Sequence, residues 1–186
     1  MKQMRKNNPR YRNKETLTFL DHPAQLAGFY PVNREGQGPG TEVLLRDGRV
    51  VYVPLSTRTF MDHLAGKMFL NLNVLKDWVR KELEISYYLP LPIAPELLLM
   101  AVKTRTVTVK GDKVHGYVNL HALADPLMIQ EQDTCSTPFL LLKNGSVFPC
   151  LNLQPTIRNR YNLAHLSTHL RDRAKLPPNP TPEDNE

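Results

Sequence analysis

The sequence predicts an α+β fold of two pseudo-repeated halves, each a small, mostly antiparallel sheet with a hairpin followed by a helix. The first observation is a repeated stretch, because residues 44–51 read LLRDGRVV and residues 141–148 read LLKNGSVF. The second is that a helix-compatible segment follows each copy, after a proline in the connecting loop. The third is the proline-containing segment 87–95, which would join the two halves. Two matched units favour duplication, with coincidence as the alternative.

Each repeated stretch is expected to form a strand, a tight turn and a second strand. Residues 47–48 (Asp-Gly) and 144–145 (Asn-Gly) suit a two-residue type I′ turn, because both central residues of that turn need a positive φ. Side chains alternate along a strand, so Val43 and Leu45 would face one side and Leu44 the other. We therefore expect partial burial on both faces of this hairpin.

The first half begins with short strands at residues 16–20 and 26–30, where apolar residues dominate. Glycine-rich residues 36–40 predict a flexible turn before the first repeated strand.

Helices are expected after the first hairpin. Ser56 or Thr57 can cap a helix N-terminus, and apolar residues then recur at helical spacing from 60 to 83. Gly66 and the Asn-Leu-Asn step at 71–73 predict a division into two helices.

The segment 87–95 contains three prolines, which exclude a helix or a central strand, so we expect it to be extended and packed. The second half would then hold strands at 97–102, 107–109 and 116–120, a turn at 111–112, and a short helix or loop over 122–131.

The last helix is predicted from residue 156 to about residue 175 by its apolar periodicity. The row expected to face the core is Ile157, Tyr161, Ala164 and Thr168, widened by Leu163, Leu166 and Leu170. Another row is polar throughout and consists of Arg158, Asn162, His165, His169 and Arg173, with Arg160 nearby. This helix is the most informative predicted surface.

Charge is unevenly distributed along the chain, whose formal net charge is +6. Residues 1–14 form a basic segment without acids, expected to be a disordered arm, although a merely solvated tail is the alternative. The chain would then comprise an N-terminal half at 15–95, a C-terminal half at 96–176, and a disordered acidic tail at 177–186.

Several classes of protein are disfavoured by composition. Cys135 and Cys150 are too few for a disulfide framework, and no signal sequence or membrane-spanning run of about 20 apolar residues is present, so we expect a cytoplasmic protein with no membrane partner. His165 and His169 have the one-face spacing of a zinc helix but lack the glutamate and a third ligand. No glycine loop suits phosphate binding. We therefore expect no enzyme activity, no metal and no cofactor.

Cationic residues gather in three places: the arm, the segment 103–113 and the last helix. Basic residues along a helix can neutralise DNA phosphates, and arginines in an arm can enter a narrow A·T minor groove. Solvated charge is the competing explanation for each patch. Together the patches favour nucleic-acid binding.

Three stretches resemble the ComK family, the competence transcription factors of Gram-positive bacteria: residues 95–105, 116–123 and 139–145 with the following helix. The resemblance implies a transcriptional activator that binds A·T-rich boxes through the minor groove as a homo-oligomer. It also implies turnover through a MecA-type adaptor and the ClpC protease. Residues 59–69 depart from the family pattern, so no DNA contact is carried over there. A weaker analogy links the repeated unit to LytTR DNA-binding domains.

The resulting hypothesis is a double-stranded-DNA-binding regulator that activates DNA-uptake genes. The alternative is a non-enzymatic adaptor or scaffold that binds an acidic protein. The resemblance contributes the loop 103–105, and the cationic patches contribute the rest. The candidate DNA-binding residues are Lys103, Thr104, Arg105, Arg158, Arg160, His165, His169, Arg173, Arg10 and Arg12.

Overall fold

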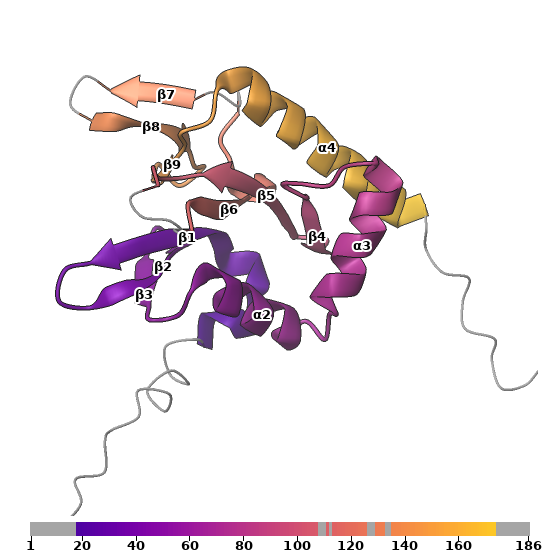
Figure 1. Cartoon of the computed structure of the whole chain (residues 1–186), viewed down its shortest axis with the longest axis horizontal. Helices are drawn as coiled ribbons and strands as arrows, with labels where there is room; N and C mark the ends of the chain where they lie inside the picture. Colours follow the sequence, from indigo (N-terminus) through magenta and orange to yellow (C-terminus); the bar gives the residue numbers. More distant parts are fainter. Residues whose placement is uncertain (1–17, 108–110, 112, 126–128, 133–134, 174–186) are drawn as a thin grey trace, which may run out of the picture.

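The computed structural model describes residues 18–107, 111, 113–125, 129–132 and 135–173 (Figure 1). The predicted α+β class is confirmed: the described residues form a six-stranded antiparallel sheet, a smaller three-stranded sheet, and helices packed on both faces of the larger sheet. Among these residues, no helix combines the length and apolarity needed to cross a bilayer.

The larger sheet has the strand order β3-β2-β1-β6-β5-β4. Its strands are β1 (Leu26–Arg34), β2 (Gly38–Leu45), β3 (Val50–Val53), β4 (Leu91–Ala94), β5 (Leu97–Lys103) and β6 (His115–Asn119). The smaller sheet contains β7 (Ile129–Gln132), β8 (Cys135–Leu141) and β9 (Val147–Pro149). The helices are α2 (Thr57–Lys67), α3 (Leu72–Leu83) and α4 (Gln154–Arg173), with short 3-10 turns at Thr18–Asp21, Pro23–Gln25 and Leu120–Ala122.

The larger sheet separates two hydrophobic cores. Val43 and Leu45 point into the core that α2 and α3 cover, whereas Leu44 points into the core beneath α4 and the smaller sheet. The expected alternation along this strand is therefore confirmed. In Figure 1, α4 lies above the strands and α2 lies below them. β5 is apolar along its length because both of its faces are buried.

Strands from both predicted halves join in one sheet. β1 pairs with β6 through Gly28↔Val118 and Phe29↔Tyr117, so the larger sheet crosses the expected boundary at residue 95. The second hairpin instead belongs to the smaller sheet. A strand, a turn, a strand and a helix do occur twice, at 38–67 and 135–173. The pseudo-repeat is not confirmed by this arrangement, and duplication stays a prediction.

The predicted type I′ turns are wrong, and both hairpins use a longer turn. The N–H of Gly48 donates to the Leu45 carbonyl, and the N–H of Gly145 donates to the Leu142 carbonyl, at 3.0 and 2.9 Å. Only the glycines have positive φ, at 90° and 83°. Each loop is thus a type I turn followed by a left-handed glycine, the geometry of a three-residue hairpin.

Other predicted elements differ from the structure at identifiable points. The strand predicted at 16–20 is wrong over its described part, where residues 18–21 form a 3-10 turn. The strand at 107–109 falls mostly outside the described residues. β4 accommodates Pro92 because it is the edge strand, where a missing N–H costs no ladder hydrogen bond. Within the region 122–131, where a short helix or loop was predicted, residues 124–125 are loop and residues 129–131 belong to β7.

The division of the helical region is confirmed. Ser56 caps α2, its hydroxyl accepting from the Thr59 N–H at 3.1 Å. Asn71 caps α3, its side-chain oxygen accepting from the N–H groups of Asn73 and Val74. The two caps explain why the periodic stretch breaks where it does.

Candidate nucleic-acid interface

Helix α4 carries five of the predicted DNA-binding residues. Ile157, Ala164 and Ser167 form its buried stripe, which is narrower than predicted because Leu166 is 48% exposed. Arg158, His169 and Arg173 are exposed, and His165 is half-buried. Asp172 is the only acid in this helix. We call Arg158, His165, His169 and Arg173 the α4 row.

Arg160 fixes α4 to the sheet. Its Nη1 donates to the Ala101 carbonyl of β5 at 2.8 Å, and its guanidinium carbon lies 4.0 Å from the centroid of the Tyr88 ring. Burial lowers the pKa of this guanidinium. A cation–π contact of this kind contributes about 0.5–2 kcal/mol. Arg160 therefore holds the helix in place. Its guanidinium is less available for a contact with DNA than the sequence predicts.

The loop 103–105 begins at the end of β5 and is hydrogen-bonded to the segment that leads into α4. The Lys103 N–H donates to the Asn152 side-chain oxygen, and the Leu151 N–H donates to the Lys103 carbonyl, both at 2.7 Å. The Lys103 and Arg105 side chains are half-buried. The loop and the start of α4 are thus held side by side.

Thr104 has a structural role in place of the predicted DNA contact. Its side chain is only 5% exposed, and its hydroxyl and N–H both donate to the Val114 carbonyl, at 3.1 and 2.8 Å. A buried hydroxyl with a satisfied donor has little to offer a ligand. The prediction for Thr104 is corrected accordingly.

Lys103, His115, Arg160 and Tyr88 form what we call the strand-end cluster. The centroids of the Tyr88 and His115 rings are 4.8 Å apart, so Tyr88 contacts both His115 and Arg160. Burial lowers the pKa of His115, and the charges of Arg160 and Lys103 lower it further. The structure therefore brings two of the predicted cations together near the start of α4.

A second group, the turn cluster, consists of Arg46, His121 and Lys143. Burial lowers the pKa of His121 first, followed by the charges of Arg46 and Lys143. A hydrogen bond to the Pro95 backbone and the charge of Glu96 act in the opposite direction. The three side chains also line one pocket of about 370 Å³.

The turn cluster is electrostatically linked to α4. Burial lowers the pKa of His165, and the nearby His121 and His169 lower it further. The His165 ring packs edge-on against Tyr161 with 4.4 Å between centroids, and its Nε2 is buried without a hydrogen-bond partner. His121 is therefore near enough to influence the pKa of His165 and to be influenced by Arg46 and Lys143.

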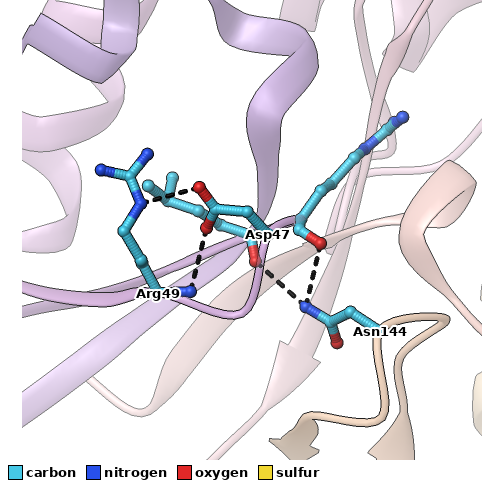
Figure 2. A network of polar contacts seen from close by, with 5 residues as sticks. Asp47, Arg49 and Asn144 are labelled. Carbon is cyan, nitrogen blue, oxygen red and sulfur yellow. Dashed lines mark hydrogen bonds and ion pairs between the residues drawn. The ribbon is translucent and has the colours of Figure 1, made fainter.

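The two hairpin turns contact one another directly. The Asp47 carboxylate accepts from the N–H and Nε of Arg49, as Figure 2 shows, and these bonds lower the pKa of Asp47. The Asn144 side-chain amide donates across to the backbone carbonyls of Leu45 and Arg46, at 3.1 and 3.2 Å (Figure 2). Asn144 thus places Lys143 beside Arg46.

Sequence reasoning missed Arg46, His121 and Lys143 as site residues. Arg46 and Lys143 occupy matching positions in the two repeated stretches, and this match was the available signal. His121 had no such signal, because its neighbours are distant in sequence. Arg10 and Arg12 lie outside the described residues.

The described residues contain neither a candidate metal site nor, at Cys150, a thiol suited to nucleophilic chemistry. In the part of the chain that the structure describes, no group of three or more His, Cys, Asp or Glu residues could hold a metal ion. Cys150 is fully buried, and burial raises the pKa of its thiol, which makes it a poor nucleophile.

Comparisons with known proteins do not identify the chain: no family model, curated protein or solved structure matches it.

Proposed function

We propose that this protein is a double-stranded-DNA-binding transcriptional regulator and acts without enzymatic chemistry, metal or cofactor. The observation that carries the proposal is the exposure of Arg158, His169 and Arg173 along one helix, α4. Basic side chains spread along a helix and its neighbours suit the regular spacing of DNA phosphates.

The resemblance to the ComK family supports finer parts of the proposal. On that basis the protein activates DNA-uptake genes through A·T-rich sites, with Lys103 and Arg105 reaching toward the minor groove. It would act as a homo-oligomer and be turned over through a MecA-type adaptor and the ClpC protease. The arm that contains Arg10 and Arg12 would add contacts in the groove.

An adaptor or scaffold that binds an acidic protein is the second candidate. It is favoured by two exposed apolar side chains: Phe69, in the connection between α2 and α3, is 100% exposed, and Val74, in the first turn of α3, is 63% exposed. Exposed apolar groups of this kind are more useful against a protein than against DNA phosphates.

Gel shifts on an A·T-rich duplex and on a scrambled duplex of the same length separate the two candidates. A DNA-binding regulator should bind both duplexes, prefer the A·T-rich one, and lose affinity steeply as salt rises. An adaptor should show neither a preference between duplexes nor tight binding to either. Weak binding without a preference between the duplexes would contradict the proposed DNA-binding function.

The Arg105→Ala variant tests which basic side chains recognise the DNA sequence. We expect this change to narrow the affinity gap between the two duplexes and to cost about 1–3 kcal/mol on the A·T-rich one. Arg158→Ala should instead weaken binding to both duplexes about equally, because a phosphate contact carries no sequence information. An Arg105 variant that keeps its full A·T preference would contradict the assignment.

A further inference from the structure

A pocket of about 370 Å³ lies where the two hairpin turns meet the end of β6. Ala27 and Leu142 contribute apolar lining, and Arg46, His121, Lys143 and Asn144 contribute polar groups. The elements that supply these residues are far apart in sequence but are fixed together by the Asn144 amide, which bonds to the backbone of the first turn. The pocket is thus held by the fold and does not depend on one flexible loop.

Arg46 is the central side chain of this pocket. Its Nη2 donates to the Glu96 carbonyl at 3.0 Å, which fixes the guanidinium, whereas its Nε is buried and has no hydrogen-bond partner. A buried donor without an acceptor is unfavourable and uncommon in folded proteins. Because protein atoms cover this Nε, a ligand in the pocket would meet the Nη groups of Arg46.

The charge around the pocket favours an anion. Arg46 and Lys143 are cations, and both are close enough to His121 to disfavour its protonated form. Glu96 is the acid that acts on His121 in the opposite direction, and it has the smallest effect of the neighbours. Neither Arg46 nor Lys143 has a carboxylate partner within the described residues.

We propose that this pocket binds a phosphate group through Arg46, Lys143 and His121. A guanidinium, an ammonium and an imidazole from three elements can donate to different oxygens of one tetrahedral anion, and arginine is well suited to phosphate geometry. If Arg46 served only as an ion-pair partner, a carboxylate would be expected beside it.

The same chemistry is offered by a backbone phosphate of DNA and by a free phosphate-containing small molecule. Binding of a DNA phosphate rests on the proposed function, since the pocket adjoins the α4 row through His121 and His165. Binding of a free phosphate-containing molecule does not depend on that function. The experiment therefore includes both ligands.

Isotope-labelled protein is titrated with inorganic phosphate, and separately with an A·T-rich duplex, at constant ionic strength set with sodium chloride. We expect phosphate to shift the amide signals of Arg46, His121, Lys143 and Asn144 along saturable curves. Lys143→Gln should weaken phosphate binding by about tenfold, as expected for the loss of one charge-assisted contact. Arg49→Gln is the control, because Arg49 is a basic residue of the first hairpin that pairs with Asp47 outside the pocket.

Arg46→Gln should abolish saturable phosphate binding, and thermal unfolding shows whether this variant stays folded. Lys143 is exposed, so its variant keeps the proposal testable even if Arg46→Gln unfolds. Unsaturable shifts, or equal binding by Lys143→Gln and Arg49→Gln, would overturn the phosphate site. Saturable phosphate binding without duplex binding would support the site with a free phosphate as its source and reject the proposed function. Saturable binding of both ligands, weakened together by Lys143→Gln, would support a DNA phosphate.

Discussion

Asn119 joins three segments of the chain, around residues 26, 96–98 and 119–121. Its side-chain nitrogen donates to the Leu26 and Glu96 carbonyls at 2.9 and 3.0 Å, and its oxygen accepts from the N–H groups of Leu98 and His121. The side chain is completely buried. Because the Glu96 carbonyl also accepts from Arg46, Asn119 helps to position the guanidinium that lines the pocket.

Asn119→Leu should lower the free energy of unfolding by about 1–3 kcal/mol, because the replacement has a similar size but leaves buried backbone groups without partners. Urea unfolding measures this change. Asn159→Leu is the control, since Asn159 is exposed on α4. Equal unfolding free energies for the two variants would contradict the role assigned to Asn119.

Side chains such as Asn119 could not be predicted from the sequence. Its partner Leu26 lies 93 residues away, and no local pattern marks an asparagine that bonds to distant backbone groups. The burial of Thr104 could not be predicted for a related reason. Its loop position near two cations gives no sign that its hydroxyl is buried against Val114. The exposed position of Arg158 could be predicted, because helical periodicity alone places it in a row beside the one that contains Ile157.

At the level of elements, the connection between α2 and α3 departs most from ordinary sequence preferences. The N–H groups of Phe69 and Leu70 donate back to Gly66 and Ala65, as in a Schellman motif, and Phe69 has φ of 51°. Glycine is the usual residue at this position because a Cβ atom is disfavoured there. Phe69 offsets none of this cost by packing, since its side chain is fully exposed.

Phe69→Gly should raise the free energy of unfolding by about 1 kcal/mol, because it removes the left-handed strain without losing a buried contact. Phe69→Ala is the matched control, since it removes the ring but keeps the Cβ atom. Thermal unfolding of both variants shows whether the gain in stability comes from relieving backbone strain or from removing an exposed ring. A gain in stability for alanine as large as that for glycine would contradict the explanation.

The elements themselves were predicted unevenly. Both hairpins and the helix after each hairpin follow from strand-like runs around Asp-Gly and Asn-Gly and from the spacing of apolar residues. The turn type was wrong because the dipeptide also suits the longer turn, in which only the glycine needs a positive φ. The side chain of Asn144 in the second turn also donates to the backbone of the first hairpin. This is a tertiary contact, which the local sequence does not reveal.

At the scale of the whole molecule, the sheet unites strands that the sequence divides between two halves. Local patterns predicted most of the strands but not their order, because the pairing of β1 with β6 depends on contacts about 90 residues apart in the chain. The same long-range pairing assembles the turn cluster. The α4 row was therefore predictable, whereas the turn cluster was not.

Stability should fall on acidification, because the folded protein lowers the pKa of His115, His121 and His165, chiefly by burial. Well above about pH 6.5, the ordinary pKa of histidine, these side chains are neutral in both states and contribute nothing to the pH dependence. As the pH falls below that value, the unfolded chain binds protons more readily and is favoured.

Thermal unfolding at about pH 7 and about pH 5.5 tests this expectation. The unfolding temperature should be lower at the acidic pH, and His165→Gln should reduce the difference by removing one of the affected groups. His63→Gln is the control, since His63 is exposed on α2. An unchanged difference for His165→Gln would contradict the linkage.

The central claim is that DNA binds along α4, and the salt dependence of binding tests it most directly. Affinity for one A·T-rich duplex is measured from about 50 to about 200 mM salt for the unaltered protein, Arg158→Ala, and Arg58→Ala. Arg58 is a matched control, because it is exposed on α2 across the sheet from α4. We predict that Arg158→Ala weakens binding and reduces the slope of log affinity against log salt by about one, while Arg58→Ala leaves it unchanged. An unchanged slope for Arg158→Ala, or an equal reduction for Arg58→Ala, would contradict the claim.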